Sequence, residues 1–169
     1  LFSTYWRKRT APPSANMHPD RDGCGLLWCS PVAPNDGQHA AAVTNLATDL
    51  VLSHGFEPAI SLTVITDRTL ACIISIAYDR DVPGEDARAL ACYHDLLDRL
   101  AEEGYHSYRL SIGSMSYMGK STYTDILDRF KRALDPSLIL APGRYTAAQS
   151  PAASETRASR QSPALAEPR

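Results

Sequence analysis

The sequence predicts an α+β fold of the ferredoxin-like type, in which strand, helix, strand, strand, helix and strand follow in order (βαββαβ) and both helices cover one face of an antiparallel sheet. Two adjacent segments rich in Ile, Val and Thr meet at the short polar junction Asp67-Arg68, which is typical of a β-hairpin. A long segment with helical spacing of apolar residues precedes this pair, and another follows it. One more strand candidate precedes the first helical segment and another follows the second, which completes the pattern.

The first strand and the first helix are expected before residue 55. A short apolar run from Cys24 to Pro31 is followed by turn-forming residues, which is typical of a buried strand, and Leu27 and Trp28 are expected in its core. The segment His39–His54 repeats apolar residues at helical spacing, and Gly55 follows where a left-handed cap would lie. This pattern predicts a helix with one buried face.

The hairpin strands are expected at Ala59–Thr66 and Thr69–Tyr78, because both runs are rich in β-branched residues. A second helix is predicted over Glu85–Glu103, and it ends at Gly104. Its buried face is expected to include Leu90, Leu97 and Leu100.

The last strand is predicted over Tyr105–Ile112. A further helix is expected over Thr122–Leu134, stopping at Asp135-Pro136 because proline disfavours helical geometry in the residue before it. Aromatic packing is the expected role of Tyr117 and Tyr123, which flank the start of this helix.

The chain of 169 residues has room for one domain with a core, and 44% of its residues are hydrophobic. We expect residues 1–23 to connect to something upstream, residues 24–146 to form the domain, and residues 147–169, rich in Ala, Ser, Pro and Arg, to be a disordered tail. The chain begins with Leu1 and therefore reads as a piece of a longer protein.

The net charge of -2, with a pI near 6.2, gives no general attraction to nucleic acid. No apolar run reaches the length of about 18 residues that a membrane span needs, so a soluble protein is expected, in either the cytoplasm or the periplasm. The five histidines are spread without metal-ligand spacing, so no metal site is predicted. The four cysteines, expected to be buried free thiols, are Cys24, Cys29, Cys72 and Cys92.

Tyr108 and Arg109 are the most informative neighbours in the sequence. A tyrosine hydroxyl and an arginine guanidinium both donate hydrogen bonds, and arginine stays charged at any working pH, so the pair can receive a substrate that becomes negative. The alternative is a surface pair in which the arginine merely covers an apolar neighbour. Arg144 follows Gly143, which lets the backbone come close to a ligand, but Arg144 is equally compatible with an exposed turn.

Five segments, in this order, resemble the C-terminal part of the vanillyl-alcohol oxidase and 4-cresol dehydrogenase flavoproteins. They are Trp6 to Arg9 (WRKR), Cys24 to Val32 (CGLLWCSPV), Tyr108-Arg109, Asp135-Pro136, and Ile139 to Arg144 (ILAPGR). The resemblance runs from about Leu1 to Tyr145, and it rests on the ordered set because no segment is specific alone.

The resemblance implies that Tyr108 and Arg109 bind the phenolate of a 4-alkylphenol. Hydride leaves the benzylic carbon in this chemistry, and the electron push of the phenolate makes the departure possible. Lowering the pKa of a phenol from about 10 to about 7 needs roughly 4 kcal/mol. Two hydrogen bonds to a charged acceptor, at about 1.5–3 kcal/mol each, can supply it.

The resemblance also implies a cap over FAD, with Arg109, Gly143 and Arg144 near the cofactor and the main FAD-binding domain upstream. Family members often attach FAD to a His or Tyr, but the corresponding neighbourhood here holds Leu26, Leu27 and Trp28, so a non-covalent flavin or a tether elsewhere is implied. A homodimer of the full-length protein is expected, and a cytochrome c subunit is compatible with the family. The alternative from another class is a stand-alone ferredoxin-like module that binds a ligand or a protein without catalysis.

Overall fold

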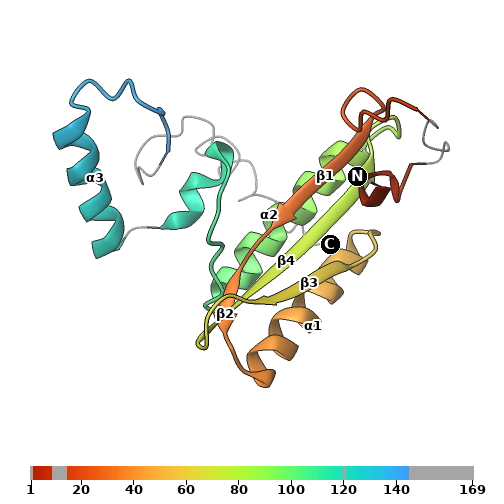
Figure 1. Cartoon of the computed structure of the whole chain (residues 1–169), viewed down its shortest axis with the longest axis horizontal. Helices are drawn as coiled ribbons and strands as arrows, with labels where there is room; N and C mark the ends of the chain where they lie inside the picture. The colour runs from red at the N-terminus through yellow and green to blue at the C-terminus, as the bar shows by residue number, and fades with distance from the viewer. Residues whose placement is uncertain (1, 9–14, 120, 145–169) are drawn as a thin grey trace, which may run out of the picture. The chain divides into compact units, whose positions relative to one another are not determined.

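The computed structural model describes residues 2–8, 15–119 and 121–144. The chain divides into two compact units, Leu1–Arg109 and Leu110–Arg169, and each is described by itself below. Figure 1 shows the sheet and its helices in the first unit and the helix α3 in the second. The predicted tail, 147–169, lies outside the described residues.

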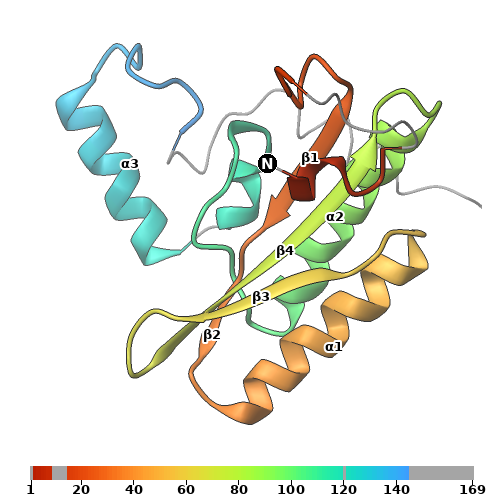
Figure 2. The ribbon, with the colours of Figure 1, turned by 45° about the vertical axis from the view of Figure 1, so that its right-hand side comes forward.

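The first unit contains a four-stranded antiparallel sheet built around one long strand. Its strands are β1 (Cys24–Cys29), β2 (Val32–Pro34), β3 (Ala59–Val64) and the central β4 (Thr69–Asp79). Ile74 is opposite both Cys29 of β1 and Ile60 of β3, so these strands lie on opposite edges of β4 (Figure 2). Val32 of β2 is opposite Ala71, so β2 continues the edge that β1 begins.

The first strand predicted over Cys24–Pro31 is β1, which ends at Cys29, and a second short strand, β2, forms in the turn-forming segment that follows. Pro31 separates them because it has no backbone N–H to give to the sheet, although its carbonyl still accepts the N–H of Cys72 at 2.9 Å. The predicted hairpin is confirmed as β3 and β4, whose ends differ from the predicted ones by one or two residues.

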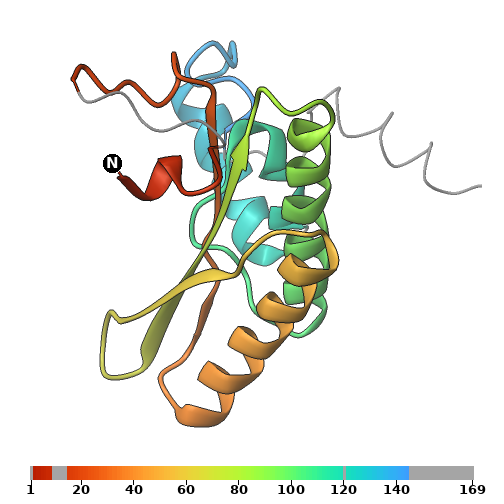
Figure 3. The same ribbon diagram turned by 90° about the vertical axis from the view of Figure 1, so that its right-hand side faces the viewer.

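Helices α1 (Gly37–Ser53) and α2 (Glu85–Glu102) cover one face of this sheet, as predicted (Figure 3). Asp36 caps α1, because its carboxylate accepts the N–H groups of Gln38 and His39. The core lies between the sheet and the helices, and it contains Leu70, Cys72, Ile74 and Ile76 of β4, Val43, Ala47 and Val51 of α1, and Ala89, Cys92, Leu96, Leu97 and Leu100 of α2.

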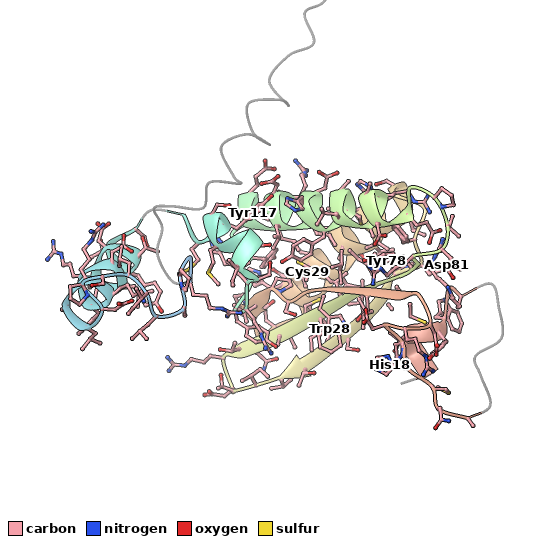
Figure 4. The ribbon with its side chains drawn as sticks, turned by 90° about the horizontal axis from the view of Figure 1, so that it is seen from above. His18, Trp28, Cys29, Tyr78, Asp81 and Tyr117 are labelled. Atoms are coloured by element: carbon pink, nitrogen blue, oxygen red, sulfur yellow. The ribbon has the colours of Figure 1, made fainter. Side chains whose placement is uncertain are left out.

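Two large apolar residues expected in the core are exposed. Trp28 is 61% exposed, because side chains alternate along β1 and its neighbours Leu27 and Cys29 take the face toward the helices. Figure 4 shows Cys29 on the side of α2 and Trp28 on the other side of the strand. Leu90 is 50% exposed, so the buried face of α2 is narrower than predicted.

The predicted last strand over Tyr105–Ile112 is wrong. One isolated antiparallel bridge, between Pro31 and Ser107, is all the strand pairing described for this segment. The last backbone hydrogen bond from this segment to the sheet comes from Tyr108, and Ser111 begins a 3-10 helix, η2 (Ile112–Met118), by accepting the N–H of Ser114 on its carbonyl. The sheet thus keeps the antiparallel α+β arrangement, but its fourth strand is β2 rather than a strand after α2.

The segment before the sheet is held to it by charge. A short 3-10 helix, η1 (Phe2–Tyr5), is followed by Lys8, whose ammonium pairs with Asp79 at 2.8 Å and also with Asp81. The Tyr5 hydroxyl donates to Asp22 at 2.6 Å. This segment therefore packs on the outer end of β4 rather than hanging free.

The second unit contains η2 and α3 (Thr122–Leu134), whose predicted bounds are confirmed. A capping box between Ser121 and Thr124 begins α3. Tyr123 is 64% exposed, so the predicted packing role of this tyrosine is wrong. Within the described ranges, no helix is long and apolar enough to cross a membrane.

Candidate functional site

The segment that carries Tyr108 and Arg109 is fixed at both ends. Helix α2 stops at Glu102, and Gly104 takes a left-handed φ of 83° that reverses the chain. Tyr105 is then buried, its N–H donates to the carbonyl of Leu100 at 2.8 Å, and its hydroxyl lies 2.9 Å from Nδ1 of His39 on α1. The segment therefore starts from the helical layer of the domain.

Backbone hydrogen bonds then hold the segment along the junction between β1 and β2. Val32 N–H donates to the carbonyl of His106 at 3.0 Å, and Tyr108 N–H donates to the carbonyl of Ser30 at 3.1 Å. The same junction is the Ser-Pro sequence that the family resemblance contains. Tyr108 is thus positioned by main-chain groups that do not depend on its own side chain.

Both predicted site residues are exposed. The Tyr108 side chain is 60% exposed, and Arg109 is exposed at the end of the first unit. Arg109 forms no ion pair with any residue in the described part of the chain. A hydroxyl and an uncommitted guanidinium on neighbouring residues can donate several hydrogen bonds to an anion.

The buried cysteine thiols of the first unit are unreactive. Cys29 lies 3.9 Å from the Ser107 hydroxyl, and burial raises the pKa of Cys29 to about 12. Burial also raises the pKa values of Cys72 and Cys92 to about 11. All four cysteines are buried and free, as predicted, and a thiolate nucleophile at neutral pH is not compatible with these values.

Gly143 and Arg144 belong to the second unit. Gly143 has a left-handed φ of 78°, and a Cβ added to it would lie 3.4 Å from a methyl carbon of Ile112. Arg144 N–H donates to the carbonyl of Ala141 at 3.1 Å, which closes a tight turn, and the guanidinium forms no ion pair within the described ranges. Each of the two predicted site pairs thus lies within its own unit.

Two residues support the predicted site residues in ways that the sequence does not predict. His39 supports Tyr105, and no sequence signal links residues 66 positions apart. Asp135 is expected from the sequence to end a helix and to form part of the Asp135-Pro136 motif, and the structure adds that its carboxylate organises the turn before Gly143. Among the described residues, no group of three or more His, Cys, Asp or Glu side chains could hold a metal ion.

No protein-family model matches the sequence. The chain is 47% identical over 147 residues to 1'-carboxy-chondrochloren decarboxylase of Chondromyces crocatus, which is 86% of this chain and 27% of that protein. It is 32% identical over 127 residues to the 4-cresol dehydrogenase [hydroxylating] flavoprotein subunit of Pseudomonas putida, which is 73% of this chain and 24% of that protein.

Two solved structures share the fold. The crystal structure of p-cresol methylhydroxylase with substrate bound matches with a TM-score of 0.66 at 31% identity, over 72% of this chain and 24% of that chain. The isoeugenol complex of 4-ethylphenol oxidase from Gulosibacter chungangensis matches with a TM-score of 0.65 at 25% identity, over 73% of this chain and 25% of that chain.

The antiparallel sheet with its helical layer is thus the α+β fold found in FAD-linked oxidases. More particularly, the chain belongs to the flavoprotein family of 4-cresol dehydrogenase, p-cresol methylhydroxylase and 4-ethylphenol oxidase. It spans about a quarter of the length of the relatives it matches.

Proposed function

We propose that this chain is the substrate-binding C-terminal portion of an FAD-dependent oxidoreductase that oxidises 4-alkylphenols. The observation that carries the proposal is the Tyr108-Arg109 pair, exposed and held by backbone hydrogen bonds to the β1–β2 junction. The name of one relative and the titles of two solved structures support a phenolic substrate, because they refer to cresol, ethylphenol and isoeugenol.

In this proposal, Tyr108 and Arg109 donate hydrogen bonds to the substrate oxygen and keep it as a phenolate. Arg109 suits the role because it has no carboxylate partner within the described residues, so its charge is not already neutralised. The negative charge on the oxygen spreads into the ring and weakens the hold on a hydride at the benzylic carbon. The pair would therefore act by making the substrate a better hydride donor.

The described residues are compatible with a flavin. FAD, when bound, supplies the acceptor for the hydride. Arg109 and Arg144 offer uncommitted positive charge, and Gly143 offers a backbone that can come close to a planar or anionic group. We assign Arg109, Gly143 and Arg144 to cofactor binding, with the rest of the FAD site in polypeptide that this chain does not span.

The more similar relative favours a second candidate, the decarboxylation of a phenol whose side chain carries a carboxylate. After benzylic hydride loss, the bond from the adjacent carbon to the carboxylate can break. Carbon dioxide leaves, the bonding pair forms a carbon–carbon double bond, and the ring oxygen becomes a phenolate again. Tyr108 and Arg109 would hold the same oxygen at the start and the end of this sequence.

A titration of the natural full-length polypeptide that contains this chain tests the proposal. Under anaerobic conditions, 4-cresol, 4-ethylphenol and 3-(4-hydroxyphenyl)propanoate are added in turn while the flavin absorbance and the release of carbon dioxide are recorded. Bleaching by the alkylphenols supports oxidation, and bleaching with carbon dioxide release from the propanoate supports the second candidate.

The Arg109→Ala variant should lose the bleaching, whereas Arg68→Ala, which removes an exposed arginine from the hairpin turn, should keep it. A full-length protein that binds no flavin, or that keeps its phenol reactivity in Arg109→Ala, would contradict the proposal. The first of these results would favour the non-catalytic module instead.

A further inference from the structure

The turn that follows α3 has an unusual backbone. Leu138 and Ala141 have φ values of 52° and 43°, a region that residues with a Cβ rarely adopt, and Gly143 follows at 78°. Two of the three non-glycine residues with positive φ in the described part of the chain lie in this one turn. Something must hold the backbone in a shape that its own side chains disfavour.

Apolar packing does not hold it. Leu134, Ile139 and Leu140 are 79%, 74% and 61% exposed, so the large side chains of the turn contribute little buried surface. Without burial, a turn of this kind would sample several backbone conformations.

The carboxylate of Asp135 is what connects the two ends of the turn. One oxygen accepts the N–H of Ile139 at 3.0 Å, and the other accepts the N–H of Leu140 at 2.8 Å. Asp135 is 5% exposed although its surroundings are open, because these backbone groups and Lys131 enclose it.

Lys131 completes the arrangement from the last turn of α3. Its ammonium donates both to the Asp135 carboxylate and to the carbonyl of Leu140. Hydrogen bonds to a charged acceptor are roughly twice as strong as those between neutral groups. Lys131 also lowers the pKa of Asp135, which keeps the acceptor charged.

We propose that Asp135, with Lys131, is a positioning residue that fixes the turn from Leu138 to Arg144 and sets the direction in which Gly143 and Arg144 are presented. The inference rests on the proposed function for its final step, the contact of these two residues with the flavin. The Asp135–Lys131 pair, called the clamp below, is linked to that step by the hydrogen bond from the N–H of Arg144 to the carbonyl of Ala141. Ala141 is the second residue of the turn with a left-handed φ.

The clamp itself is tested on the 169-residue chain by amide hydrogen exchange measured with NMR. Asp135→Asn keeps the size of the side chain but loses its charge and one acceptor, so the amides of Ile139 and Leu140 should exchange about 10-fold faster or more. The matched variant Asp128→Asn removes the same charge from α3 and should leave both amides unchanged. Unchanged exchange in Asp135→Asn would overturn the proposal.

The positioning role is tested by the affinity of the full-length apoprotein for FAD in a double-mutant cycle. Asp135→Asn and Arg144→Ala should each weaken binding, and the double variant should be no weaker than Arg144→Ala alone. Fully additive losses, or a loss in Arg144→Ala with none in Asp135→Asn, would overturn the positioning role. No loss in Arg144→Ala would instead show that the proposed function assigns the wrong residue, while the exchange experiment still reports on the clamp.

Discussion

The sequence reveals only part of what Tyr108 and Arg109 need for their proposed role. Their adjacency is visible in the sequence, and it is what pointed to an anion site. Their support is not visible, because it comes from the carbonyl of Ser30 and the N–H of Val32, about 75 residues earlier in the chain. The sequence thus predicts which groups are available, and the fold decides where they are held.

Replacing Tyr108 with Phe should lower kcat/KM for 4-alkylphenols by about 10- to 150-fold, because one hydrogen bond to a charged oxygen contributes roughly 1.5–3 kcal/mol. The backbone N–H that positions residue 108 is retained, so the fold should not change. Tyr123→Phe removes a hydroxyl from another exposed tyrosine and serves as the control. Equal kinetics in Tyr108→Phe and the wild type would remove Tyr108 from the site.

Gly25 is a second position where one atom matters. A Cβ at Gly25 would lie 2.3 Å from the ring of Tyr78, its partner on β4. Gly25→Ala should therefore lower the free energy of unfolding by about 1–3 kcal/mol in urea denaturation. Gly37→Ala, where no atom lies within 4 Å of the added Cβ, should change it much less. A larger loss in Gly37→Ala than in Gly25→Ala would contradict the packing described for β1.

At the scale of elements, the positions where the helices begin follow from capping residues close by in the sequence. Helix α1 begins where Asp36 can cap it, and α3 begins at the Ser121–Thr124 capping box. The last strand did not follow, because a strand needs a partner, and the partner edge is broken at Pro31. A β-rich composition in Tyr105–Ile112 could not show that the neighbouring edge offers two hydrogen bonds and no more.

The cap of α1 gives a prediction at this scale. Asp36→Ala removes the acceptor for two N–H groups at the start of the helix, so the free energy of unfolding should fall by about 0.5–2 kcal/mol. Asp49→Ala, in the body of the same helix, is the matched control and should have a smaller effect. If both variants unfold at the same urea concentration, the cap contributes nothing.

At the scale of the whole molecule, the family predicted from the ordered set of motifs is confirmed, although no single motif is specific. The relatives confirm the family over about 72% of the chain. The position of Trp28 was wrong, because an apolar run alone does not show which face of a strand a second layer covers. Composition and motif order therefore predicted the class of fold better than the burial of particular side chains.

The attachment of the N-terminal segment predicts a dependence on acid. The hydrogen bond from Tyr5 is the main cause that lowers the pKa of Asp22 to about 2. A carboxyl whose folded pKa is lowered stabilises the fold above its unfolded pKa of about 3.9, and that contribution is lost as the pH falls toward 2. The difference in free energy of unfolding between the wild type and Tyr5→Phe should therefore shrink between about pH 4 and pH 2. A constant difference across this range would show that Tyr5 acts through packing instead.

The central claim is that Tyr108 and Arg109 stabilise a bound phenolate, and the ionisation of the bound substrate tests it most directly. The ultraviolet absorbance of 4-ethylphenol bound to the full-length protein is titrated with pH after the flavin has been reduced, so that the bound phenol is not oxidised, because phenol and phenolate absorb differently. The account predicts that the pKa of the bound phenol lies near 7, about three units below its free value near 10, and that it returns toward 10 in Arg109→Ala. A bound phenol that stays protonated up to pH 9 in the unmodified protein would contradict the account.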